Sequence, residues 1–151
     1  LFPTPGAQCP GEHRFEYAIY TGRGPWEGSG ILREAELYTA PPRLLATGRG
    51  EGPLPPEFSF LRVEPPGIPV SALKPAEEGR LSVLRLYNPG EEEVAVALSF
   101  PWRPERAVLL DLAEEELEEL PISGNTLHLT LGGNEIATVG VTLEGPRSGD
   151  G

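Results

Sequence analysis

The chain has 151 residues, of which 38% are hydrophobic, and it carries a formal net charge of −11. This length suffices for one domain with a buried core, and the acidic charge excludes nucleic acid and anionic membranes as partners, because both attract basic surfaces. No apolar run approaches the roughly 18 residues that a membrane-spanning helix needs, and no secretory signal peptide is visible. We therefore expect a cytoplasmic protein.

Unusual amino-acid usage adds further expectations. The 19 Gly and 18 Pro fall between alternating apolar runs, which is typical of a β fold with many turns. Cys9 stands alone, which excludes an internal disulfide. Few thermolabile residues and much proline fit a thermophile, although biased base composition would give the same usage. Because the chain lacks Met, we also expect part of a longer polypeptide; an alternative start codon or processing would equally account for this.

The N-terminal third predicts one strand and one helix. In residues 14–20 aromatic and aliphatic side chains alternate with others, which predicts a strand with an aromatic inner face. Residues 31–39 have the apolar spacing of a helix, which Ser29 could cap and the prolines after Ala40 would end. Residues 44–46 could form a short edge strand, and the segments between these elements predict loops.

The central segment, residues 70–100, predicts the middle of a sheet. Residues 81–87 are apolar on both faces, with Leu81 and Val83 on one side and Leu84 and Leu86 on the other. Residues 94–100 alternate strictly, so Val94, Val96, Leu98 and Phe100 share one face. Because the turn residues Asn88-Pro89-Gly90 lie between these two strands, we expect a β-hairpin at the centre of the sheet.

Further alternating segments extend the sheet on both sides. In residues 107–112, Val108, Leu110 and Leu112 are expected to point inward, and residues 114–119 predict a turn followed by an extended segment. The other predicted strands are residues 58–63, 70–74, 126–131 and 136–143. Eight to ten strands and one short helix indicate an all-β fold, an antiparallel β-sandwich. We expect residues 1–144 to form this single domain and residues 145–151 to be a flexible tail.

Catalytic and metal-binding patterns are weak. His13 and His128 fall on different predicted strands without metal-ligand spacing, so no metal site is predicted. Asp111 could join a histidine and a serine only by chance, since no nucleophile elbow is present. The glutamate runs 91–93 and 114–119 predict solvated turns, which would not raise a carboxyl pKa as a glycosidase acid requires. Glu135 is expected to make a structural hydrogen bond. No catalytic residue is predicted.

Three side chains are weak candidates for substrate binding. Trp26 lies in a glycine-rich loop and Trp102 between two prolines, where an aromatic ring could stack on a sugar or cover a small core. Arg85 lies within the two-sided apolar strand, where it needs a hydrogen-bonding partner. A structural role is one interpretation of Arg85, and a guanidinium held toward a domain interface is the other.

Three ordered stretches resemble the C-terminal β region of α-mannosidases of glycoside hydrolase family 38. Residues 4–20, TPGAQCPGEHRFEYAIY, look like that family's Pro-Gly-x-Gln and Gly-x-His-x-Phe-x-Tyr-Ala segment. Residues 71–88 are similar to its Ala-Leu-Lys and Arg-Leu-Tyr-Asn pattern, and residues 112–138 to its closing Leu-x-Glu and Glu-Ile-x-Thr segments. One departure is Thr21-Gly22-Arg23, where the family often has a second histidine, so no role of that histidine is carried over.

The resemblance implies an indirect part in catalysis. In this family a zinc ion and an aspartate nucleophile lie in an N-terminal catalytic domain that hydrolyses α-mannosides with retention, and no counterpart of their ligands occurs in these residues. The chain would then be a non-catalytic C-terminal domain without a cofactor of its own. It would pack on the catalytic domain of the same polypeptide, and it could form a wall of the cleft for a mannose-containing saccharide.

Two other functions stay open. A free-standing carbohydrate-binding module would use exposed aromatic side chains, with Trp26 and Trp102 as candidates. A scaffold or dimerisation domain would instead expose a large apolar patch and form a homo-oligomer.

Overall fold

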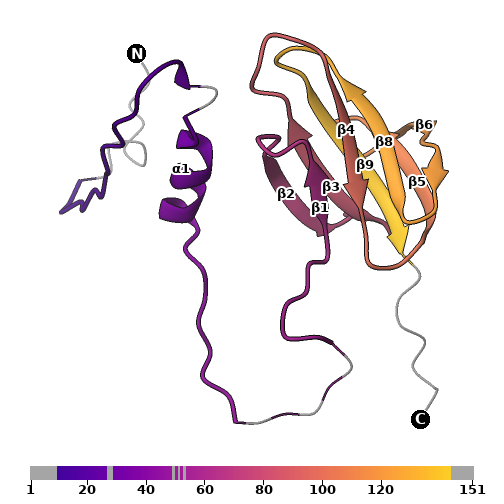
Figure 1. The fold of residues 1–151 in the computed structure, drawn as a ribbon, viewed down its shortest axis with the longest axis horizontal. Helices are drawn as coiled ribbons and strands as arrows, with labels where there is room; N and C mark the ends of the chain where they lie inside the picture. Colours follow the sequence, from indigo (N-terminus) through magenta and orange to yellow (C-terminus); the bar gives the residue numbers. More distant parts are fainter. Residues whose placement is uncertain (1–9, 27–28, 49, 51, 53, 144–151) are drawn as a thin grey trace.

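The computed structural model describes residues 10–26, 29–48, 50, 52 and 54–143, and its strands form two antiparallel sheets packed face to face (Figure 1). The sheets have the strand orders β1-β4-β8-β7 and β2-β3-β9-β5-β6. The elements are α1 (Ile31–Thr39), β1 (Arg62–Glu64), β2 (Val70–Pro75), β3 (Ser82–Tyr87), β4 (Val94–Ser99), β5 (Pro104–Leu110), β6 (Glu116–Glu119), β7 (Ile122–Ser123), β8 (Thr126–Leu131) and β9 (Ile136–Leu143). The predicted antiparallel β-sandwich with one short helix is confirmed. Cys9 and the predicted tail lie outside the described residues.

The main core lies between the two sheets. Its buried members come from facing strands, with Leu84 and Leu86 on β3, Val96 and Leu98 on β4, and Leu127 and Leu131 on β8. Val94 and Phe100 pack in the same cluster, so the predicted inner face of β4 is confirmed. Period-two alternation places these side chains on one side of each strand, and the two apolar faces then cover each other.

A second, smaller core covers the opposite face of the five-stranded sheet. Val83, Val108 and Leu110 are buried there beneath Ala76 and Leu81. This explains the two-sided strand 81–87, since β3 has a buried side chain on each face. The prediction for residues 107–112 is wrong in part: Val108 and Leu110 belong to this outer cluster, and Leu112 is 71% exposed. The strand ends before Leu112 because the Asp111 carboxylate accepts the N–H groups of Ala113 and Glu115, which turns the chain.

The predicted central hairpin is wrong, because β3 and β4 lie in different sheets. β3 pairs with β2 and β9, whereas β4 pairs with β1 and β8. Each of the two strands carries an apolar face. Pairing them in one sheet would place both faces on the same side of that sheet. Crossing between the sheets instead lets these faces pack against each other across the core.

The crossing loop is fastened to the loop between β8 and β9. Asn88 is 5% exposed, and its amide Nδ2 donates to the carbonyl oxygens of Glu92 at 2.7 Å and Gly132 at 2.9 Å. Its Oδ1 accepts the N–H of Gly90 at 3.0 Å. The N–H of Asn134 donates to the carbonyl of Gly90 at 2.9 Å, so the two loops hold each other at one end of the sandwich.

The N-terminal third contributes no strand among the described residues. The predicted strand 14–20 and edge strand 44–46 are absent, and the predicted strand 58–63 is reduced to β1. No other described segment pairs with residues 14–20, so their alternation is not realised as a sheet. The predicted helix is confirmed as α1, but its N-cap is Gly30, and the Ser29 hydroxyl donates instead to the carbonyl of Trp26 at 2.7 Å.

The outer core makes Gly140 a tight position. A Cβ there would lie 2.9 Å from Leu81 Cδ1 and 3.0 Å from Leu110 Cδ1, because β9 passes directly beneath these side chains. We expect Gly140→Val to lower the free energy of unfolding by about 1–3 kcal/mol through overpacking. Urea denaturation measures the change. An unchanged midpoint would show that Leu81 and Leu110 move aside without cost.

Candidate functional site

Two of the three predicted binding side chains meet at one hollow. Trp26, from the loop before α1, and Arg85, from β3, line a hollow of about 530 Å³ on the outer face of the five-stranded sheet. The other lining residues, which the sequence did not single out, are Leu32, Ser71, Tyr87, Asn88, Pro89, Asn134 and Ile136. Tyr87 follows Arg85 by two positions on β3, so strand alternation was the one signal that could have added it.

The polar centre of this hollow is held in place by β9. The Arg85 Nε donates to the hydroxyl of Thr138 at 3.1 Å, and Thr138 is 2% exposed. Arg85 and Thr138 lie directly opposite each other on β3 and β9. The hydroxyl therefore satisfies the half-buried guanidinium in part and orients it, as the structural interpretation of Arg85 requires. Its remaining N–H groups give the hollow donors suited to hydroxyl or carboxylate oxygens.

Trp26 and Tyr87 give the hollow two aromatic rings, and Trp26 is 49% exposed. Aromatic faces with nearby amides and a guanidinium are suited to a polyhydroxylated ring, which presents C–H groups on its faces and hydroxyls at its edge.

Trp102 does not belong to this hollow. Its ring packs 5.9 Å from that of Phe58 and 6.0 Å from that of Phe60, and the Phe58 and Phe60 rings lie 5.0 Å apart. Trp102 is half-buried in this aromatic group beside β1. The Trp102 ring thus packs against two aromatic side chains outside the hollow at Trp26 and Arg85.

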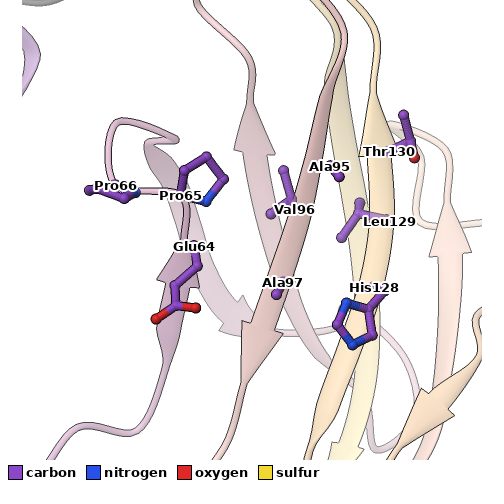
Figure 2. Close-up of a pocket in the computed structure, with 9 residues that line it drawn as sticks. All are labelled: Glu64, Pro65, Pro66, Ala95, Val96, Ala97, His128, Leu129 and Thr130. Atoms are coloured by element: carbon purple, nitrogen blue, oxygen red, sulfur yellow. The ribbon is translucent and has the colours of Figure 1, made fainter.

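A second hollow, of about 640 Å³, lies on the outer face of the four-stranded sheet (Figure 2). Its floor is Ala95 and Ala97 on β4. Glu64 on β1 and His128 on β8 stand on either side of Ala97. The full width of β4 separates this carboxylate and imidazole. Glu64 is the one carboxylate among the lining residues, so this hollow lacks the carboxyl pair that glycoside hydrolysis uses.

The other titratable candidates have structural surroundings. The His13 ring stacks on Phe15 with centroids 6.2 Å apart, and the Glu135 carboxylate accepts the N–H of Gly132, as expected of a structural hydrogen bond. The Asp111 carboxylate is engaged in its turn. Within the described residues, no group of three His, Cys, Asp or Glu side chains is placed to hold a metal ion. No helix in that part of the chain is long and apolar enough to cross a membrane.

Two groups of ion pairs involve the five-stranded sheet, one at Lys74 on β2 and one at Arg106 on β5. Lys74 Nζ lies 2.6 Å from Glu114 and 2.9 Å from Glu77, and Glu114 also accepts the N–H of Glu77. The Glu114 side chain is only 12% exposed, so the prediction of a solvated turn fails for this residue. Arg106 pairs with both Glu116 and Glu119 on β6. Hydrogen bonds from Lys74 lower the pKa of Glu114, and those from Arg106 lower the pKa of Glu116.

These lowered pKa values predict acid sensitivity. A carboxyl group whose pKa is lower in the folded state stabilises the fold above its unfolded pKa, and this contribution is lost as the pH falls through the folded pKa. Below about pH 4.3, the usual pKa of Glu, the free energy of unfolding should fall less steeply in Glu114→Gln/Glu116→Gln than in the wild type. Urea denaturation from pH 7 to pH 3 tests this. Glu118→Gln is the control, because its side chain makes no ion pair among the described residues; equal slopes in all three proteins would contradict the prediction.

The sandwich is similar to a domain found in known proteins. Residues 67–139 match the family model described as the glycosyl hydrolases family 38 C-terminal beta sandwich domain. The sandwich is a family 38 C-terminal domain. The matched range runs from the turn before β2 into β9, so it includes the two stretches within 71–138 that carried most of the resemblance. Residues 4–20, the third stretch, lie outside it.

A curated relative agrees with this family 38 assignment. The chain is 29% identical over 96 residues to a protein of Halalkalibacterium halodurans named "Putative mannosylglycerate hydrolase". The match includes 64% of this chain and 11% of that protein's length. No solved structure matches the chain significantly.

Proposed function

We propose that this chain is a non-catalytic domain of an α-mannosidase, and that it packs on a catalytic domain of the same polypeptide. The carrying observation is the family 38 match over residues 67–139. The name of the Halalkalibacterium halodurans relative adds support, since it describes a hydrolase of a mannosyl compound. The zinc ion and the aspartate nucleophile then lie outside residues 1–151. This domain contributes binding surface and stability.

Activity assays on two proteins test this proposal. The chain 1–151 should hydrolyse neither an aryl α-mannoside nor mannosylglycerate, with or without added zinc. The whole polypeptide that the gene encodes should hydrolyse at least one of them. Turnover by residues 1–151 alone would overturn the proposal, and so would a whole polypeptide that cleaves a different class of glycoside.

The hollow at Trp26 and Arg85 is the part of this domain best suited to touch a saccharide. It combines an exposed aromatic ring with a guanidinium that Thr138 orients. Stacking on an aromatic face and hydrogen bonds from a planar guanidinium are the usual means of holding a sugar ring. We infer that this hollow walls the substrate cleft of the whole enzyme.

Steady-state kinetics of the whole polypeptide test the cleft wall. Trp26→Ala should raise KM for the α-mannoside about 10-fold with little change in kcat, because it removes binding and leaves the chemistry intact. Trp102→Ala is the matched control and should leave KM unchanged. A free-standing carbohydrate-binding module is the other candidate for this hollow. It requires mannose to change the Trp26 fluorescence of residues 1–151 in a Trp102→Phe background, and a flat titration rejects it.

A further inference from the structure

Residues 14–20, which we call the arm, have the sequence of a strand without a sheet. Phe15, Tyr17 and Ile19 alternate along the arm and are 81%, 83% and 84% exposed. The sheet pairings of the described residues do not include the arm. A row of three apolar side chains with this exposure is costly in water, and in folded proteins such a row usually marks a contact surface.

The contacts along the arm already separate its two faces. Arg14 Nη2 lies 2.9 Å from Glu16 Oε1, so these two charged side chains share one side of the backbone. Phe15 stacks on His13, which is also two positions away. Contacts between residues two apart require an extended backbone, in which alternate side chains point the same way. The arm therefore has a charged face and an apolar face, as a strand of about 24 Å would at 3.4 Å per residue.

The family 38 sandwich is complete without the arm. Leu86, Leu98 and Leu127 are fully buried by their own strands, and the family match begins at residue 67, well beyond the arm. The helix that follows the arm has no buried residue, and Leu44 and Leu45 after it are 98% and 86% exposed. Figure 1 shows this N-terminal part beside the sandwich as an extended path with one helix. Trp26 and Leu32 line the hollow beside Arg85, but the sandwich does not cover Phe15, Tyr17 and Ile19 of the arm.

We propose that the arm adds as a strand to an open β-sheet edge on the part of the polypeptide outside residues 1–151. Main-chain hydrogen bonds would hold it there, and Phe15, Tyr17 and Ile19 would enter the core of that sheet. A partner within the same polypeptide is favoured over a second copy of this chain. The chain matches only 11% of the length of the Halalkalibacterium halodurans relative, so most of a protein of that kind lies outside the matched part. This inference rests on the proposed function: the arm is the attachment of this domain to the rest of the enzyme.

Amide hydrogen exchange tests the attachment. In the isolated chain, the amides of the arm should exchange at the rate of an unstructured peptide. In the whole polypeptide that the gene encodes, alternate amides of the arm should exchange about 100-fold or more slowly, because an added edge strand bonds every second N–H. Fast exchange in both proteins would overturn the proposal. Protection in the isolated chain would also overturn it, with a concentration dependence indicating a second copy and none indicating pairing within the chain.

Two neighbouring substitutions separate the faces of the arm. In the whole polypeptide, Tyr17→Ser should accelerate exchange of the arm about 10-fold or more, whereas Glu16→Ser should change it less than about 3-fold. Equal effects would overturn the assignment of the apolar face to the partner. Neither measurement uses catalysis. If the arm is protected in a polypeptide that hydrolyses no mannoside, the proposed function is contradicted and the proposed attachment of the arm is still supported.

Discussion

Gly133→Ala should be one of the most destabilising single-methyl additions in the sandwich, with a loss of about 3–5 kcal/mol in the free energy of unfolding. A Cβ at this position would overlap the carbonyl oxygen of Glu91 and lie 3.0 Å from the Glu91 Cα. The obstacle is backbone, which cannot rotate away as a side-chain end can. The two loops would have to separate, and the hydrogen bond from the N–H of Asn134 to the carbonyl of Gly90 would then be strained or lost.

Urea denaturation of the chain measures this effect, and Gly48→Ala is the matched control. A Cβ at Gly48 meets nothing within 4 Å, so we expect that variant to remain within about 0.5 kcal/mol of the wild type. If the two alanine variants unfold at the same urea concentration, the close approach of the β3–β4 and β8–β9 loops does not exist in solution.

Local patterns in the sequence predicted most strands but not their partners. Residues 94–100 and 126–131 were both predicted as strands and both contain one, and the expected face of residues 94–100 lies in the core. Period-two alternation is a local property of an extended chain, so it can be seen in a single segment. Whether β3 pairs with β4 depends on what covers each face. The partners that decide this are β9, which pairs with β3, and β8, which pairs with β4. Both lie far along the chain, so the sequence of a single segment cannot predict the pairing.

For the arm, the sequence predicted a strand that the described residues do not form. Its alternation is as regular as that of β4, yet it forms no sheet with the described residues. Strand propensity largely reflects the fit to neighbouring strands, so a sequence pattern can describe a strand whose neighbours lie elsewhere. The prediction for Leu112 failed for a local reason, because the turn that the Asp111 carboxylate organises ends β5 at Leu110, two residues earlier.

The candidate site could be predicted only as separate residues. Trp26 and Arg85 are 59 positions apart, and no motif links them; the position of the loop before α1 beside β3 brings them to one hollow. Trp102 had an equally suggestive setting between prolines and instead packs on Phe58 and Phe60. The difference depends on tertiary packing, which composition and spacing do not encode.

Asn88→Asp should destabilise the sandwich by about 3–5 kcal/mol at pH 7. The Asn88 amide Nδ2 donates to two carbonyl oxygens, and the residue is 5% exposed. The substitution keeps the shape but replaces this donor by a carboxylate oxygen, which would face both carbonyls. The N–H of Gly90 remains as a donor to the other carboxylate oxygen. One neutral donor does not compensate a buried charge that is turned toward two acceptors, so desolvation and repulsion both destabilise the fold.

The pH dependence of this variant identifies the cause. Protonation removes the charge and restores one O–H donor, so the folded state should raise the pKa of the introduced carboxyl. The stability difference from the wild type should then shrink as the pH falls from 7 toward 4. Asn125→Asp is the control, because the Asn125 amide is exposed and its contact with the carbonyl of Pro101 is a long 3.4 Å. A deficit at Asn88 that does not change with pH would point to altered packing.

Combining Asn88→Asp with Gly133→Ala tests whether both variants damage the same contact. Asn88 bonds to the carbonyl of Gly132, the residue before Gly133, and Gly133 rests against Glu91 in the loop that Asn88 organises. Once either substitution has separated the two loops, the contacts that the other substitution would disrupt are already lost. The double variant should therefore lose clearly less stability than the sum of the two single losses, by about 1 kcal/mol or more. Strict additivity would mean that the loops are held independently, and that Asn88 stabilises only its own turn.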